Sequence, residues 1–151
     1  WLHCELQNIP KGAYHFFLPN RAGKLQAKNF ITTVKLKTGD LPPVLDLEKV
    51  WANKVKMVEE IEIWLNVVEA QYHVKPIIYT NIYFYNSYLT GLVDDYPFWI
   101  AHYLQPVKPR VERDWHFWQH SEKGRVNGIA NLVDFNVFKG DSADLNSLLL
   151  K

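Results

Sequence analysis

The chain has 151 residues, of which 48% are hydrophobic and 15% aromatic, a composition typical of a globular domain with a substantial core. Its formal net charge is +1 and its 17 basic residues are scattered, which excludes the basic stripe that nucleic-acid binding requires. From its length and composition we expect one domain, 1–151. Its apolar runs are short and interrupted by charges, well below the roughly 20 residues of a membrane-spanning helix, so we do not expect it to enter a membrane.

Strand-like and helix-like patterns alternate along most of the chain. Apolar, β-branched and aromatic runs predict six strands, at 12–17, 44–48, 76–80, 98–103, 115–120 and 132–138. A helix is predicted between residues 20 and 36, with Gly39 as its C-terminal stop. A second helix follows the apolar stripe Val55, Val58, Ile61, Leu65, Val68 and Tyr72. A shorter helix should begin at Thr80 or Asn81 and end at Gly91.

The order of these elements indicates the fold class. Strands that alternate with helices are typical of parallel βαβ units, so we expect an α/β fold. From Trp115 onward the short polar and glycine turn SEKGRVNG predicts antiparallel strands without helices between them. The expected architecture is a mixed α/β barrel. A complete eightfold barrel takes roughly 250 residues, so this barrel is either irregular or lacks its beginning.

The predicted strand VLDLE, residues 44–48, carries two carboxylates two residues apart. Side chains of a strand alternate between faces, so Asp46 and Glu48 share one face with Val44. Their backbones lie about 6.5–7 Å apart, which can place two carboxyl groups on either side of a glycosidic bond. One carboxyl must donate a proton while the other stays ionised, and mutual repulsion in a partly apolar setting raises the pKa of one member. Glu48, which is longer and ends the strand, is the predicted acid.

Two acids at this spacing can also simply end a strand, and an isolated match of this kind carries a high risk of a false positive. Aromatic side chains near the other strand ends favour the catalytic interpretation, because the apolar C–H faces of sugars stack on aromatic rings, although most large aromatics belong to the core. The phosphate-binding signatures G-x-G-x-x-G and G-x-x-x-x-G-K-[ST] are absent.

Other reactive side chains are predicted to be structural. His116 and His120 have the spacing of a helical zinc site, but the segment between them reads as a strand and no third ligand is evident. His15 is predicted to be a hydrogen-bonded interior residue. Cys4 lacks a partner for an internal disulfide, and no serine occupies a G-x-S-x-G elbow. We expect neither a metal nor an organic cofactor.

The chain resembles the family 25 glycoside hydrolases, the CH-type lysozymes or N-acetylmuramidases. The matching segments, in order, are GAYHFFLPN (12–20), QAKNF (26–30), GDLPPVLDLE (39–48), PIIYTN (76–81), FWIAHY (98–103) and FWQHSEKGRVNGIANLVDFNVF (117–138). This resemblance implies an irregular, TIM-like (βα)5β3 barrel that cleaves the β-1,4 bond between N-acetylmuramic acid and N-acetylglucosamine. The expected partner is the glycan strand of peptidoglycan. The protein is expected to be a monomer that is secreted or located in the cell envelope.

The resemblance also implies roles for individual residues. The family's D-x-E maps onto Asp46 and Glu48, with Glu48 resembling the general acid, and the family's acid in the last strand maps onto Asp134. Cleft residues are expected at Tyr14, Tyr79, Trp99, Tyr103 and Gln119. The implied outcome is retention, with the acetamido group of the substrate as nucleophile and Asp46 orienting it. Carboxylate spacing alone leaves the stereochemical outcome open.

The chain departs from the family at its start. The family begins with a strand that carries a further aspartate in a G-I-D-V-S-like context, then a helix and a second strand, and none of these precedes Trp1. The segment WLHCELQNIPKGAYHFF resembles the end of the second helix running into the third strand, so we expect a barrel truncated at its N-terminus. Two other functions stay open: a non-catalytic peptidoglycan-binding module, and a hydrolase of another N-acetylglucosamine polymer such as chitin.

Overall fold

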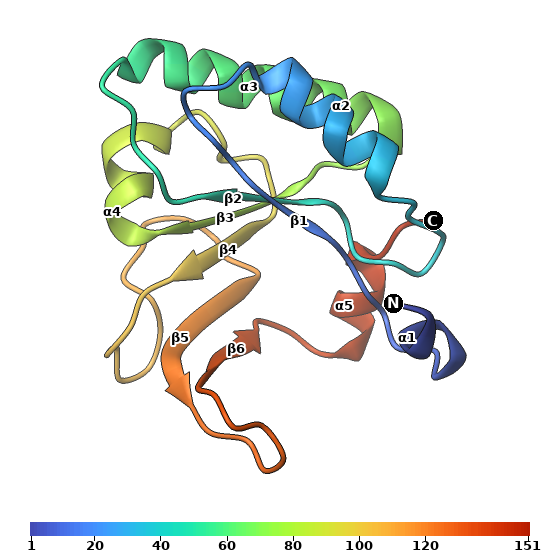
Figure 1. Cartoon of the computed structure of the whole chain (residues 1–151). Helices are drawn as coiled ribbons and strands as arrows, with labels where there is room; N and C mark the ends of the chain where they lie inside the picture. Colours follow the sequence, from blue (N-terminus) through green and yellow to red (C-terminus); the bar gives the residue numbers. More distant parts are fainter.

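The computed structural model describes residues 1–151 and contains one six-stranded sheet (Figure 1). In both chain and spatial order the strands are β1 (Tyr14–Phe16), β2 (Val44–Leu47), β3 (Ile77–Asn81), β4 (Phe98–Ala101), β5 (Phe117–Gly124) and β6 (Val133–Phe138). The first five run parallel, β6 is antiparallel to β5, and no pairing joins β6 to β1. Each strand overlaps a predicted one, and the predicted α/β class is confirmed.

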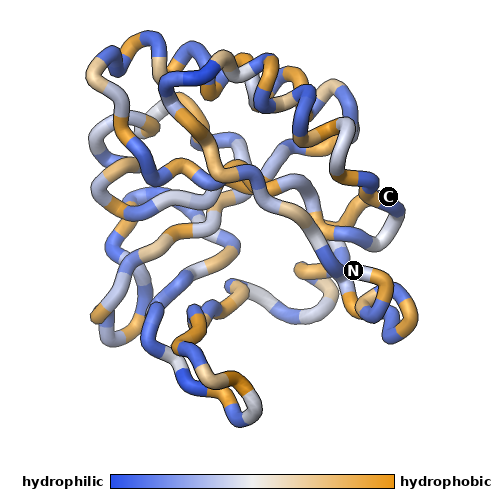
Figure 2. The backbone as a smooth tube through the Cα atoms, in the orientation of Figure 1, coloured by the Kyte–Doolittle hydropathy of each residue, from blue (hydrophilic) through white to orange (hydrophobic).

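Two helices, α2 (Gly23–Thr33) and α3 (Lys54–Tyr72), lie together over one face of the sheet (Figure 1). Hydrophobic and hydrophilic residues alternate along both of them (Figure 2), as expected for helices with one buried side. The carboxamide of Asn53 caps α3 by accepting from the backbone N–H of Lys56 at 3.1 Å. At the other end of α3, His73 adopts the left-handed conformation that commonly terminates helices.

The two helices approach each other closely at Gly23. A β-carbon at this position would lie 2.0 Å from the carbonyl oxygen of Glu60, so only glycine fits the contact. The backbone N–H of Gly23 also donates to the Glu60 carboxylate at 2.6 Å, which satisfies one of the free donors at the start of α2.

Two details of the predicted helices are wrong. Val55 is 72% exposed, and the buried side of α3 instead includes Met57 and Trp64, one turn and three turns into the helix. The first predicted helix ends at Thr33, so Gly39 is not its stop. The chain becomes extended at Val34, whose carbonyl accepts a hydrogen bond from the Tyr72 hydroxyl at 2.9 Å.

Shorter helical segments complete the fold. They are α1 (Leu2–Leu6), α4 (Ile82–Phe84), which continues as the π-helix η1 (Tyr85–Leu89), and α5 (Ser142–Leu148). As predicted, the helical segment after β3 begins beside Asn81, whose side chain caps it, and ends before Gly91, which has a φ of +81°. Helix α5 was not predicted, although Asp141 and Asp144 form a capping box at its start. None of the helices combines the length and hydrophobicity needed to cross a membrane.

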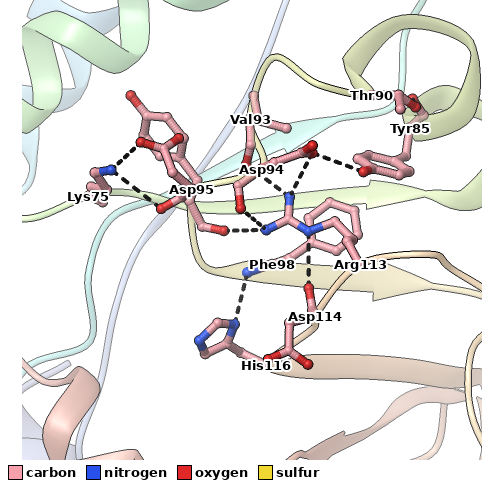
Figure 3. A network of polar contacts seen from close by, with 11 residues as sticks. Lys75, Tyr85, Thr90, Val93, Asp94, Asp95, Phe98, Arg113, Asp114 and His116 are labelled. Carbon is pink, nitrogen blue, oxygen red and sulfur yellow. Dashed lines mark hydrogen bonds and ion pairs between the residues drawn. The ribbon is translucent and has the colours of Figure 1, made fainter.

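Arg113, in the long connection between β4 and β5, binds the segment that precedes β4 (Figure 3). The guanidinium of Arg113 lies 4.3 Å from the centre of the Phe98 ring and donates to the carbonyls of Val93 and Tyr96 at 2.9 and 2.6 Å. Nearby, His116 Nδ1 accepts from the backbone N–H of Phe98 at 3.3 Å. These contacts fix β4 against the start of β5 without a helix between them.

The sheet separates two environments. Side chains that point toward α2 and α3 belong to one buried hydrophobic cluster, which includes Leu45, Leu47, Ile78, Phe98, Ile100 and Trp118. Because strand residues alternate, their neighbours point to the opposite face, where no helix covers them.

Candidate active site

A groove of about 290 Å³ lies on the uncovered face of the sheet. Its lining residues are Tyr14, Val44, Asp46, Glu48, Tyr79, Trp99, Gln119 and Asp134. All three predicted catalytic acids and four of the five predicted cleft residues therefore line one groove, which receives side chains from β1 through β6. The fifth, Tyr103, does not line the groove and contacts it through Gln119.

Asp46 sits on the floor of this groove. Strand β2 is buried along its whole length, so the Asp46 side chain is only 8% exposed, and its Oδ1 atom is buried without a hydrogen-bond partner. Burial, reinforced by the charge of Glu48, raises the pKa of Asp46 to about 7. Asp46 therefore holds a proton in the free groove at slightly acidic pH.

Glu48 follows directly after β2 and is exposed. Both it and Asp46 line the groove together with Val44, as the alternation of strand residues predicted. The pKa of Asp46 is raised, whereas the proton-donating role was predicted for Glu48. Asp46 is buried within the sheet, whereas Glu48 is exposed beyond the end of β2.

Asp134 approaches the same groove from β6, the edge strand, and its side chain is exposed. Burial raises the pKa of the Tyr79 phenol, and the charges of Glu48, Asp46 and Asp134 all contribute to this increase. The three acids thus lie near Tyr79, which remains a neutral hydrogen-bond donor. They are not grouped closely enough to hold a metal ion.

A chain of side-chain hydrogen bonds leads from Tyr79 in the groove to Tyr103 outside it. Tyr79 donates its hydroxyl proton to Gln119 Oε1 at 2.7 Å, and Gln119 Nε2 donates to the Tyr103 hydroxyl at 2.9 Å. The buried amide of Gln119 therefore joins β3, β5 and the end of β4, and holds both phenol rings in fixed positions.

Trp99 presents the largest ring in the groove. It packs edge-on against Tyr79, with ring centres 5.3 Å apart, and tilts against Phe117 at 5.5 Å. Its indole N–H donates to Asn136 Oδ1 on β6 at 2.9 Å. Asn136 was not among the predicted site residues, although its place two residues after Asp134 in a predicted strand puts both on one face.

Tyr14 stands at the other end of the groove, on the short edge strand β1. It is 69% exposed and lies in register with Val44 of β2. An exposed ring beside the groove can stack on a sugar without competing core contacts.

The three histidines predicted to be structural, His15, His116 and His120, do not line the groove. His15 is hydrogen-bonded to Gln26 at 3.0 Å and stacks on the Trp64 ring, with centres 5.6 Å apart. His116 accepts the hydrogen bond from Phe98, and His120 packs against Trp118.

Comparisons with known proteins identify the family to which the chain is similar. The model of the glycosyl hydrolases family 25 matches residues 2–129. An uncharacterized protein, YegX, of Escherichia coli O157:H7 is 39% identical over 99% of this chain and 55% of its own length. Lysozyme M1 of Streptomyces globisporus is 33% identical over 93% of this chain and 53% of its own length.

Solved structures share the fold of the chain. A family 25 glycosyl hydrolase from Bacillus anthracis superimposes with a TM-score of 0.86 at 29% identity, over 97% of this chain and 72% of that one. A bacterial lysozyme from Streptomyces coelicolor gives a TM-score of 0.81 at 30% identity, over 98% of this chain and 76% of that one. The chain spans about half the length of the curated relatives it matches.

Proposed function

Because the chain belongs to glycosyl hydrolase family 25, we propose that it hydrolyses the β-1,4 bond between N-acetylmuramic acid and N-acetylglucosamine in peptidoglycan. The observation that carries this proposal is the convergence of Asp46, Glu48 and Asp134 on one aromatic-lined groove. Paired carboxyl groups beside stacking rings are what cleavage of a glycosidic bond requires. The similarity to a protein named Lysozyme M1 supports the choice of substrate.

In this proposal Glu48 is the general acid. Its exposed carboxyl stands at the mouth of the groove, where it can reach the oxygen of a bound glycosidic linkage. A sugar seated over Glu48 excludes water from it and favours its uncharged form, while a hydrogen bond from the substrate to Asp46 favours the charged form of Asp46. Substrate binding thus moves the proton of the pair from Asp46 to Glu48.

The reaction proceeds with retention through the acetamido group of the substrate. Glu48 protonates the leaving oxygen as the acetamido oxygen attacks the anomeric carbon, which breaks the glycosidic bond and forms a cyclic oxazolinium ion. Asp46, on the floor of the groove, accepts the hydrogen bond of the acetamido N–H and orients the group. Water then opens the ring and returns a proton to Glu48.

The remaining groove residues bind the sugars and stabilise the positive charge that develops during cleavage. Asp134 contributes negative charge opposite the developing positive charge of the sugar. Trp99 and Tyr14 offer ring faces to the sugars, while Tyr79 and Gln119 supply fixed polar groups. The protein acts on the glycan strands as a monomer, secreted or in the cell envelope, without metal or organic cofactor.

The test compares cleavage of purified wall sacculi and of chitin by the wild type and by Glu48→Gln. We expect the wild type to release reducing ends from sacculi, with muramitol as the product after borohydride reduction. Glu48→Gln should lower the rate by at least about 100-fold, because general acid catalysis is lost. The matched control is Glu59→Gln, an exposed glutamate on α3, which should cleave at the wild-type rate.

Other outcomes would redirect the proposal. Cleavage of chitin in preference to sacculi would assign a different N-acetylglucosamine polymer. Retention of the protein on insoluble sacculi without release of reducing ends would indicate a binding module. Near-normal cleavage by Glu48→Gln would remove this residue from the acid role.

A further inference from the structure

We infer that Asn136 is a positioning residue, which holds the Trp99 ring as a wall of the substrate groove and ties it to the strand that carries Asp134. The inference rests on the proposed function in that it takes a glycan as the ligand. Its basis is the hydrogen bond of 2.9 Å from Trp99 Nε1 to Asn136 Oδ1. Because an indole N–H can only donate, the oxygen of the carboxamide must face Trp99.

The bond reaches across a whole strand. Asn136 of β6 pairs with Gln119 of β5, and Gln119 pairs with Ala101 of β4. Trp99 lies two residues before Ala101 on the same face, so its indole passes diagonally over β5 to reach β6. A side chain on the edge strand therefore determines the orientation of a ring rooted two strands away.

The other contacts of Trp99 do not determine the orientation of its indole ring. Tyr79 and Phe117 touch its ring edge-on or at a tilt, with centres 5.3 and 5.5 Å away, and neither supplies a polar partner. The ring is only half-buried, so no close-packed core encloses it. The hydrogen bond to Asn136 is the directional contact that selects one orientation of the indole.

The same bond couples Trp99 to a catalytic candidate. Asp134 and Asn136 are two residues apart on β6 and share a face. No residue of β6 is fully buried, and the strand pairs only with β5. The bond therefore joins the Trp99 ring to the same face of the edge strand that carries Asp134.

The test uses a double-mutant cycle of Asn136→Ala and Trp99→Phe, in the chain as it is naturally produced. Binding is measured with soluble glycan strands of alternating N-acetylglucosamine and N-acetylmuramic acid, and turnover is measured on sacculi. Asn136→Ala should weaken binding and raise KM by about fivefold, with kcat changed less than about twofold. In the Trp99→Phe background, Asn136→Ala should have no further effect.

Three controls separate positioning from general damage. Asn136→Asp keeps the acceptor oxygen and should bind the strands within about twofold of the wild type. Asn66→Ala removes an exposed asparagine on α3 and should change nothing. Water can replace the lost partner of the half-exposed indole, so Asn136→Ala should melt within about 2 °C of the wild type.

A spectroscopic measurement reports on the bond without any ligand. The indole N–H signal of Trp99, assigned by its loss in Trp99→Phe, should shift and exchange faster with solvent in Asn136→Ala. An unchanged signal, or full additivity in the cycle, would overturn the inference. Binding that follows the expected pattern without cleavage of sacculi by the wild type would overturn the proposed function alone. Equal binding by all variants would overturn the inference even if cleavage is normal.

Discussion

Leu47 and Asp46 are neighbours on β2 and nearly equally buried, at 1% and 8% exposure, yet they occupy opposite faces of the sheet. Leu47 packs into the hydrophobic cluster beneath α2 and α3. Asp46 faces the groove and leaves one buried oxygen without a partner. The two faces of β2 therefore have different roles. The covered face contributes to stability, whereas the uncovered face presents a polar group to the groove without a hydrogen-bond partner, at some cost in stability.

The largest expected effect comes from damage to the covered face. Leu47→Ala should lower the free energy of unfolding by about 3 kcal/mol, because it removes packed methyl groups and leaves a cavity. Urea denaturation at pH 7 measures the loss. Rates of cleavage per folded molecule should stay near wild type, and a large fall in kcat would show that the two faces are not independent.

On the opposite face, Asp46→Asn should have the reverse effect on stability. Because the native pKa is about 7 and the unfolded value about 3.9, the native state binds more protons between these pH values. Wild-type stability should therefore fall as pH rises from about 4 to 7 and remain low above. At pH 8 the variant should be more stable than the wild type by about 1–2 kcal/mol, and at pH 4 nearly equal to it.

Unfolding curves at pH 4 and pH 8 test this expectation about stability. Cleavage assays measure the activity of the same variant. The stabilised variant should lose most of its activity, since an amide cannot accept the acetamido hydrogen bond as a carboxylate does. If Asp46→Asn were destabilising at pH 8, the charge of Asp46 would be compensated in the folded protein.

A smaller effect is expected where the groove face is fully hydrogen-bonded. Gln119→Leu removes the bridge between Tyr79 and Tyr103 but keeps a similar volume. We expect kcat/KM on sacculi to fall about fivefold, which corresponds to about 1 kcal/mol, because both phenols lose a fixed orientation. Gln71→Leu, on the exposed end of α3, serves as the control and should leave kcat/KM unchanged.

The smallest effect should follow a change at the rim. Tyr14→Ala removes a ring that is 69% exposed on the edge strand β1, so stability should change by less than about 0.5 kcal/mol. KM for sacculi should rise about two- to threefold through the lost stacking surface. An unaltered KM would place bound glycan away from β1.

Local sequence patterns determined most of the elements and the residue types of the site. Alternation along VLDLE placed Asp46 and Glu48 on one face, and the cap at Asn81 and the break at Gly91 bounded a short helical segment. These features depend on neighbours within a few residues, which a sequence displays directly. The resemblance to family 25 added Asp134, which no local spacing connects to the D-x-E pair.

Only the tertiary structure decided which carboxyl has a raised pKa and which side chains form hydrogen bonds across the sheet. Burial of β2 between its neighbours gives the raised pKa to Asp46, although Glu48 was the predicted acid. The bond from Trp99 to Asn136 joins residues 37 positions apart across an intervening strand. Desolvation and contacts of this kind depend on which strands lie side by side, and periodicity within a single segment carries no information about that arrangement.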